Sequence, residues 1–415
     1  MLRRDLLRTM LGLGLGSLGP APAARGAPAL RAGAARIDIT PDSSVALDGY
    51  LDPGSRLSEG VHDRLFARAF AFAHGSTRIV LVSCDLTSMV FGAYLARPIL
   101  DRLSLRPDEL LLCATHTHSG PLVTLHPSYP TNVLYTERLP GLLSTVVDDA
   151  IRSMAPATLG VGRGTSPVGV NRRRIGPDGR IEMGPNPEGA IDPEVLVLQV
   201  TRSDGRQLGA LFSYACHSRS LRKPNRLVSG DVFGIAAQEV ERTQEGTVVA
   251  AFAGASGDVD PVRVVDDFST VGNAPPETVR LGHLLTAGVL QAMSAVRPCP
   301  AGRLRSATAR IPLPPKHPGA RKSVEATVVA IGDLAWIGLD CEASVGICLA
   351  LKAASPFEAT FIATNCNGWA GYLPTQHQHA EGGYEVERTA FGPDAAGELV
   401  KSVSEMLRAL RSGSG

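Results

Sequence analysis

The sequence predicts an α/β fold, a single large domain with a mixed β-sheet core flanked by helices and a metal site at the carboxyl ends of the strands. Short apolar segments alternate along the chain with longer amphipathic ones, which is the pattern of strand–helix units. The composition is 44% hydrophobic and 20% charged, as in ordinary folded proteins. No internal repeat and no low-complexity linker divides the chain, so we expect one structural unit.

The first part of the chain contains several β-prone runs that end at glycine, proline or aspartate. Residues 35–40 end at Pro41, and residues 65–72 and 79–83 form a hairpin around His74-Gly75-Ser76. Helical periodicity predicts helices at 134–154, before Pro156, and at 231–242. The remaining expected strands are 110–113, 195–200, 208–215 and 247–253.

The C-terminal part repeats this alternation. A long helix is expected at 276–296, followed by a hairpin whose turn is Gly332-Asp333. The further expected elements are strands 324–331, 334–339 and 359–364, and helices 343–354 and 395–410.

Two histidines follow the apolar strand 110–113, where the sequence reads Ala114-Thr115-His116-Thr117-His118-Ser119-Gly120-Pro121. In an extended chain, residues i and i+2 lie on the same side, so we expect His116 and His118 to share one face. Imidazole is the commonest neutral metal ligand, and α/β folds bind ligands at strand carboxyl ends. The pair therefore indicates a metal or catalytic site, although two histidines at a strand end can also be polar groups at a domain rim.

Other potential ligands follow other expected strands. Two imidazoles and a carboxylate supply the protein part of a catalytic zinc site. Taken singly, each residue has a structural alternative: Glu342 could pair with an arginine, and Tyr372 could pack in the core. The strand-end residues are His217, Asp258, Asp260, Asp340, Glu342, Asn367 and Tyr372.

Six segments in order carry a resemblance to a known family. They are Ile37–Pro41, Arg64–Arg68, Ala114–Pro121, Asn171-Arg172, Ser229–Asp231 and Gly257–Val259, and a tail from Cys366-Asn367 through Tyr372 and Tyr384-Glu385 to Gly392-Pro393 matches as well. Together they resemble the N-terminal catalytic domain of the neutral, non-lysosomal ceramidases. Because the chain ends soon after its last helix, it resembles a short member that lacks the family's C-terminal immunoglobulin-like domain.

The resemblance implies a set of site residues. It implies that His116, His217, Glu342 and Tyr372 hold one Zn²⁺ ion. It also implies that His118 assists catalysis, by proton transfer or by holding the substrate carbonyl, and that Arg172 positions and polarises the substrate. The alternatives are that His118 only supports a ligand and that the run Arg172-Arg173-Arg174 is a solvated face.

The chain departs from the family at Asp260, where the ceramidases have a serine that is sometimes assigned as the nucleophile. Aspartate cannot form the same acyl-enzyme, which leaves Ser256 as a weak substitute. The chemistry that remains is hydrolysis by zinc-bound water, because zinc lowers the pKa of bound water to about 7. Asp260 would then act as a base or as an orienting group.

Residues 1–27 read as a twin-arginine signal peptide, with Arg3-Arg4 before a short apolar stretch and Ala21-Pro22-Ala23 at its end. This predicts the twin-arginine export machinery as a partner, and a periplasmic or secreted protein in which residues 28–415 form the ceramidase-like catalytic domain. The apolar stretch is shorter than the ~20 residues of a membrane span, so no transmembrane anchor is expected.

Charge and cysteine usage exclude other classes. The net charge is +1 without a basic stripe, so we expect no nucleic-acid partner. The seven cysteines contain no CxxC pair, which argues against a structural zinc knuckle. One disulfide could form in an oxidising compartment, but the sequence does not choose its partners.

The sequence thus predicts an exported, zinc-dependent hydrolase of an amide bond, acting on a small-molecule or lipid-derived N-acyl substrate similar to ceramide, which the resemblance would place in sphingolipid metabolism. A zinc esterase or peptidase is the first alternative, because a polarised carbonyl does not select its leaving group. A catalytically degenerate relative that only binds a ligand is the second, and Asp260 motivates it.

Overall fold

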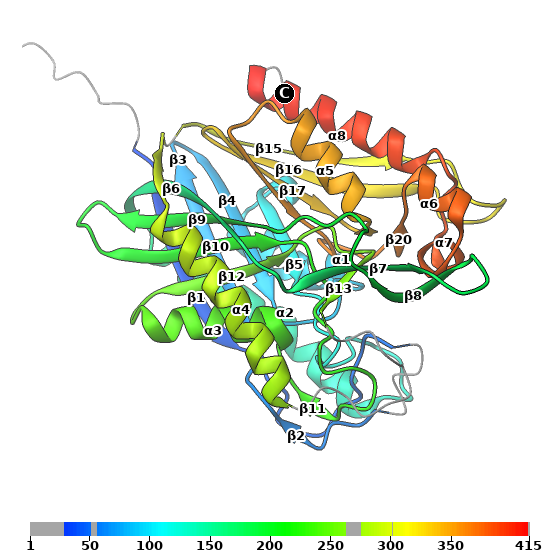
Figure 1. Cartoon of the computed structure of the whole chain (residues 1–415). Coiled ribbons are helices and arrows are strands. Elements are labelled where there is room, and N and C mark those ends of the chain that lie inside the picture. The colour runs from blue at the N-terminus through cyan, green and yellow to red at the C-terminus, as the bar shows by residue number, and fades with distance from the viewer. Residues whose placement is uncertain (1–28, 51–55, 263–274, 301, 414–415) are drawn as a thin grey trace, which may run out of the picture.

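Two β-sheets packed face to face form the centre of the protein (Figure 1). The structure, a computed structural model, describes residues 29–50, 56–262, 275–300 and 302–413. The expected signal peptide at 1–27 lies outside these residues, so that prediction is not tested. Within the described residues, helices cover the outer face of each sheet, which gives a helix–sheet–sheet–helix arrangement.

The larger sheet is mixed and has nine strands among the described residues. Its order is β12-β10-β9-β6-β1-β3-β4-β5, with β14 added beside β6. The pairs β4–β5 and β10–β12 are parallel and the others are antiparallel. The strands are β1 (Arg31–Asp38), β3 (Phe66–His74), β4 (Thr77–Cys84), β5 (Leu110–Ala114), β6 (Ala155–Thr165), β9 (Glu194–Arg202), β10 (Gln207–Tyr214), β12 (Val248–Ala253) and β14 (Arg297–Cys299).

The smaller sheet has the order β15-β16-β17-β19. Its last pair, β17–β19, is parallel, and the other pairs are antiparallel. The strands are β15 (Leu304–Pro312), β16 (Ser323–Ile331), β17 (Leu334–Leu339) and β19 (Ala359–Ala363).

The core between the sheets is aromatic at its centre. Trp336 of β17 stacks on Phe361 of β19 with ring centroids 4.2 Å apart, and it meets Phe252 of β12 edge-on at 4.7 Å. All three side chains are fully buried. Because Phe252 belongs to the larger sheet and the other two to the smaller one, this contact fixes how the two sheets sit on each other.

Helices cover the outer faces. On the outer face of the larger sheet, α1 and α2 cover one half of the strands, and α3 and α4 cover the other half. Helices α5 and α8 cover the smaller sheet. The helices are α1 (Gly92–Leu103), α2 (Pro130–Arg152), α3 (Asp231–Thr243), α4 (Pro275–Ser294), α5 (Val345–Ala354), α6 (Gln376–Glu381), α7 (Tyr384–Arg388) and α8 (Ala395–Ser412), with a short 3-10 helix η2 (Pro107–Glu109).

Three small ladders lie outside the two sheets and link the loops that follow their strands. One of them, β18–β20, places Glu342 directly opposite Tyr372. The ladders are β2 (Gly60–Val61) with β11 (Leu227–Val228), β7 (Gly169–Ile175) with β8 (Ile181–Asn186) and β13 (Val259–Pro261), and β18 (Glu342–Ala343) with β20 (Tyr372–Leu373).

The predicted mixed α/β class is confirmed, but the second sheet and several elements were not anticipated. The long strand β6 reads APATLGVGRGT, which is too rich in glycine to look like a strand. Those glycines are needed for packing: a Cβ at Gly162 would lie 1.9 Å from the carbonyl oxygen of Ala292 on α4. Glycines that let α4 pack closely on β6 therefore occupy positions where β-branched residues would usually indicate a strand.

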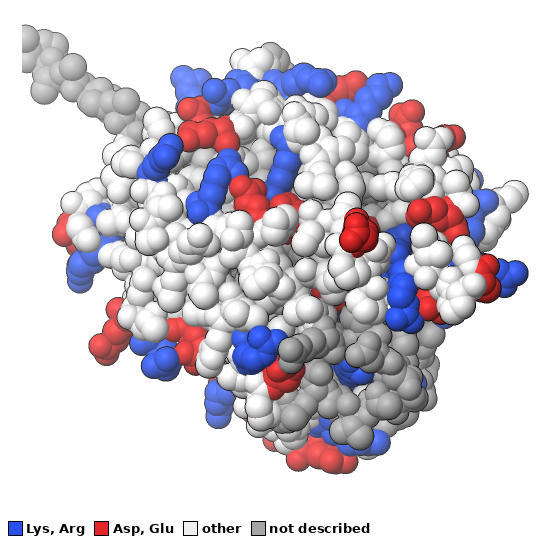
Figure 2. Space-filling view, in the orientation of Figure 1, with Lys and Arg blue, Asp and Glu red and all other residues white. Residues whose placement is uncertain are grey.

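Within the described residues, no helix is long and apolar enough to cross a membrane. Figure 2 shows lysine and arginine interspersed with aspartate and glutamate on the visible face, rather than gathered in a patch of one sign.

We expect Trp336→Ala to lower the free energy of unfolding by about 3–5 kcal/mol, because it opens a cavity between the two sheets. The measurement is urea unfolding followed by circular dichroism. Leu134→Ala, at a helix position that is 63% exposed, is the control and should change stability by less than about 0.5 kcal/mol. Similar small losses in both variants would contradict a core centred on Trp336.

Candidate metal centre

Histidines from two loops meet at one edge of the sheets. His116 and His118 follow β5, and His217 follows β10. All three are buried, and each offers a ring nitrogen within 4.8 Å of the others. Glu342, after β17 of the second sheet, places its Oε2 atom 3.3 Å from Nε2 of His116 and 3.4 Å from Nε2 of His217.

The backbone at His116 is not extended, so the strand geometry from which we expected the two histidines to share a face was wrong. The two histidines nevertheless lie together. Strand β5 ends at Ala114, and His116 adopts a left-handed conformation with φ of 61°. The loop then runs beside the loop after β10, where the amide of His118 donates to the carbonyl of Ser218 at 2.8 Å. The turn at His116 brings the imidazoles together, a strained arrangement typical of functional sites.

Hydrogen bonds fix how the rings present their nitrogens. Nδ1 of His116 lies 2.6 Å from the carbonyl of Thr87, and Nδ1 of His217 lies 2.6 Å from the carbonyl of Ser256. A carbonyl can only accept, so Nδ1 is the donor in each neutral ring and Nε2 carries the lone pair. Both lone pairs therefore face Glu342.

This donor set fits a divalent cation. The buried Oε2 atom of Glu342 has no hydrogen-bond partner, although it lies between two Nε2 atoms. Burial, reinforced by the positive charge of Arg172, lowers the pKa of His217 to about 4, so this ring is neutral at physiological pH. Burial would also lower the pKa of His116, but the Glu342 carboxylate outweighs it and raises that pKa. Two imidazoles and one carboxylate around one point are a common zinc ligand set.

His118 stands beside this group. Its Nε2 lies 3.4 Å from Nε2 of His116, and its ring meets Tyr50 edge-on with centroids 5.1 Å apart. Nδ1 of His118 is buried without a hydrogen-bond partner. Burial, with His116 and His217 adding repulsion, holds the pKa of His118 well below its usual value. A neutral imidazole has one N–H group, which can donate to a carbonyl oxygen, and one nitrogen with a lone pair, which can accept a proton.

Arg172 and Asp260 belong to a buried ion network on the other side of His217. Arg172 bonds through Nε to Glu385 at 2.9 Å and through Nη1 to Asp260 at 3.2 Å. Asp260 also pairs with Arg219, whose Nε lies 2.7 Å from Oδ1. Burial alone would raise the pKa of Asp260, but the two arginines reverse this and hold it far below its usual value. Such a carboxylate stays ionised and is a poor proton acceptor.

Tyr372 lies next to the proposed ligands. It pairs with Glu342 across the β18–β20 ladder. The guanidinium carbon of Arg172 also lies 5.6 Å from the centre of the Tyr372 ring. Metal binding by Tyr372 stays a prediction, as do the other individual roles expected from the sequence.

Sequence reasoning missed three residues at this site. Trp369 donates from Nε1 to Oε1 of Glu342 at 2.9 Å, Arg219 holds Asp260, and Tyr50 packs on His118. Arg219 could have been found, since it lies two residues after His217 in the loop that follows β10. Tyr50 gives no such signal, because only the fold brings its loop to His118.

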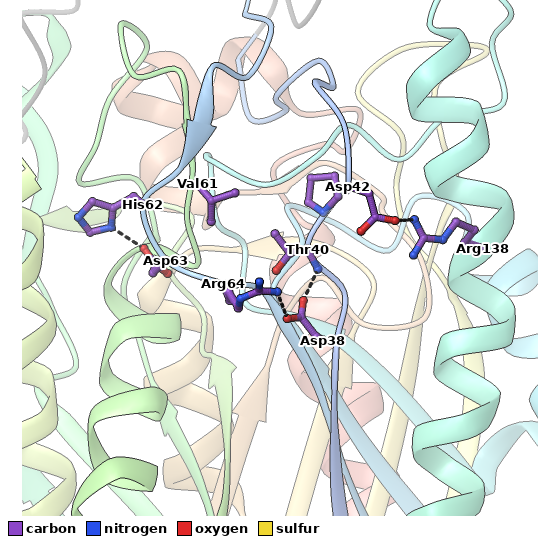
Figure 3. A pocket seen from close by; sticks show the side chains of 9 residues that line it. Asp38, Thr40, Asp42, Val61, His62, Asp63, Arg64 and Arg138 are labelled. Carbon is purple, nitrogen blue, oxygen red and sulfur yellow. Dashed lines mark hydrogen bonds and ion pairs between the residues drawn. The ribbon is translucent and has the colours of Figure 1, made fainter.

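The cleft drawn in Figure 3 is separate from the histidine cluster. It measures about 730 Å³ and none of the clustered histidines lines it. Its acids are already partnered: Arg64 pairs with Asp38, and Arg138 with Asp42. We therefore assign the chemistry to the buried cluster rather than to this cleft.

Comparison with known proteins identifies the family. The model of the family "neutral/alkaline non-lysosomal ceramidase, N-terminal" matches residues 30–266. The chain belongs to this family. The matched part includes His116, His118, Arg172, His217 and Asp260, whereas Glu342 and Tyr372 lie beyond it.

Individual relatives agree with this assignment. The neutral ceramidase of Pseudomonas aeruginosa is 32% identical over 243 residues, which are 54% of this chain but only 35% of that protein. That of Mycobacterium tuberculosis is 24% identical over 506 residues, covering 92% of this chain and 77% of that protein. For several relatives, including the Pseudomonas protein, the matched part covers only 35% to 38% of the relative's length.

The fold itself is known in this family. The crystal structure of neutral ceramidase from Pseudomonas aeruginosa superimposes with a TM-score of 0.77 over 93% of this chain and 75% of that chain. The sequence identity is 21%, so this likeness shows a shared fold. It extends over the region that the family model does not match.

We expect Trp369→Phe to weaken metal binding by about 10- to 100-fold, because the variant keeps an aromatic ring but loses the N–H group that orients Glu342. The measurement is competition with a chromogenic zinc chelator. Tyr94→Phe on α1, also an exposed aromatic side chain, is the control and should bind as the wild type does. Unchanged affinity in Trp369→Phe would show that Glu342 does not need this bond.

Proposed function

We propose that the protein is a zinc-dependent hydrolase of an N-acyl amide, with ceramide or a related lipid amide as substrate. The observation that carries the proposal is the unpartnered Oε2 of Glu342 between Nε2 of His116 and Nε2 of His217. The family membership supports the choice of an amide bond. Tyr372 is proposed as a further ligand because it pairs with Glu342.

A Zn²⁺ ion held there would polarise the scissile carbonyl and lower the pKa of an attacking water. The carbonyls of Thr87 and Ser256 keep both rings in the tautomer that leaves Nε2 free for the metal. Trp369 holds the second oxygen of Glu342, which fixes the direction of the carboxylate.

The surrounding residues would handle the proton and the substrate oxygen. His118 lies beside the proposed ligand His116 and its Nδ1 has no hydrogen-bond partner, so we assign it the transfer of a proton to the leaving amine. Arg172 has a buried Nη2 group without a partner, which can donate to a substrate oxygen that gains negative charge. The cost of burying this arginine is offset by Glu385 and Asp260.

Asp260 takes a positioning role in this proposal. Its oxygens are engaged by Arg172 and Arg219, and its lowered pKa makes it unsuited to act as a general base. Ser256 contributes its main-chain carbonyl to His217, so its backbone orients a proposed metal ligand. Water is therefore the nucleophile that this arrangement favours.

The location and extent of the protein are also part of the proposal. We take residues 28–415 as the catalytic domain and residues 1–27 as a twin-arginine signal that directs it to the periplasm or the medium. An exported enzyme would meet lipid-derived amides outside the cytoplasm.

The decisive experiment measures zinc content and amide turnover together. His116→Ala and His217→Ala should each reduce bound zinc from about one ion per chain to near zero and abolish hydrolysis of a short-chain fluorescent ceramide. His283→Ala, which removes an exposed histidine from α4, is the matched control and should retain both. Zinc retained in both site variants would refute the metal centre. Zinc without turnover of any amide or ester would favour the ligand-binding alternative.

We expect Asp260→Ser to lower kcat by about 100-fold, although it restores the residue type found in the ceramidases. The reason is that Arg172 and Arg219 lose the carboxylate that holds them. Steady-state kinetics with the same ceramide gives the measurement. Glu381→Gln, which changes a partly exposed carboxylate paired with Arg173 and His377, is the control. Equal or higher activity in Asp260→Ser would instead indicate that the serine can act as nucleophile.

A further inference from the structure

Two cysteine sulfurs touch at the junction of the two sheets, in segments that lead to the proposed metal ligands. Cys113 lies on β5, three residues before His116, and Cys366 lies in the loop after β19 that leads to Tyr372. Their Sγ atoms are 2.7 Å apart, and both residues are buried in the core between the sheets. All seven cysteines are thiols in this structure, and no other pair of sulfurs among the described residues makes such a contact.

The backbone holds this pair in the geometry of a cross-strand disulfide. Cys113 and Cys366 form an isolated antiparallel bridge. The amide of Ala114 donates to the carbonyl of Asn365, and the amide of Asn367 donates to the carbonyl of Leu112. The cysteines are therefore a non-hydrogen-bonded pair, in which Cα atoms lie about 4.5 Å apart. That spacing lies within the range of disulfides, about 4.4–6.8 Å.

The loop around Cys366 has a reason to be fastened. Both of its neighbours, Asn365 and Asn367, have positive φ angles of 53° and 57°. Such conformations are costly for residues other than glycine and persist when the surroundings hold them. Asn367 is tied to β5 by its side chain as well, since its Oδ1 accepts from the amide of Leu112 at 2.9 Å. A covalent bond at Cys366 would hold the same junction.

We propose that Cys113 and Cys366 form a disulfide that clamps the two sheets together. The bond joins the strand that leads to His116 with the loop that leads to Tyr372, so it holds the two halves of the proposed ligand set in register. It closes a loop with a sequence separation of 253 residues, and long loops gain most from cross-linking.

The oxidation balances as a thiol–disulfide exchange. The thiolate of one cysteine attacks a sulfur of a low-molecular-weight disulfide, such as oxidised glutathione, and releases one glutathione thiolate. The second cysteine then loses its proton, attacks the mixed disulfide and releases the other. Two S–H bonds become one S–S bond, and the oxidant is reduced to two thiols. Because burial raises the pKa of Cys113, the reaction occurs when the junction is transiently open.

The test uses the purified full chain, once reduced with dithiothreitol and once incubated with oxidised glutathione. After removal of the reagent, the protein is denatured, alkylated and digested without reduction. We expect the oxidised sample to contain a linked Cys113–Cys366 peptide pair and to leave two of the seven cysteines unalkylated. Seven alkylated cysteines, or a different linked pair, would overturn the proposal.

Stability provides the second readout. The oxidised wild type should melt at least about 5 °C above the reduced form. Cys113→Ala/Cys366→Ala should show no difference between the two treatments. Cys84→Ala/Cys299→Ala, which also removes two buried thiols, is the matched control and should keep the shift. A control variant that loses the shift in melting temperature would overturn the assignment. If a variant does not fold, peptide mapping of the wild type tests the proposal by itself. Neither readout depends on zinc or turnover, so the clamp and the proposed function can fail separately.

Discussion

The site depends on one electrostatic constraint, which is the placement of a buried carboxylate between two imidazole nitrogens. Glu342 Oε2 faces Nε2 of His116 and Nε2 of His217, while the opposite nitrogens of both rings are engaged by main-chain carbonyls. Three electron-rich atoms in a buried volume are stable only around positive charge, from protons or from a metal ion. The fold supplies this arrangement from two different sheets.

The face-to-face packing of the sheets is what allows the arrangement. The histidines come from loops of the larger sheet and Glu342 from the smaller one. Their meeting point is therefore set by the contact of Trp336 with Phe252 and by the junction of Cys113 with Cys366. Stability in the core and geometry at the site are consequences of the same interface.

Charge around the centre is organised in pairs that separate two roles. On one side, neutral His118 packs on Tyr50 with a free ring nitrogen. On the other, Arg172 is held between Glu385 and Asp260, and Arg219 completes the pairing of Asp260. Asp260 thus serves to hold the two buried arginines in place. The positive charge of Arg219 offsets the cost of burying this carboxylate.

The sequence alone determined the α/β class, most strand–helix alternation and the two loops that carry His116 and His217, because hydrophobic runs and their ends are local signals. It also indicated Glu342 and Tyr372 by their position after strands. Only the tertiary structure decided that the core has two sheets, that His116 turns through a left-handed conformation, and that Trp369, Tyr50 and Cys366 reach the same place. These contacts join segments far apart in the chain, and no local pattern of residues encodes which distant surfaces pack together.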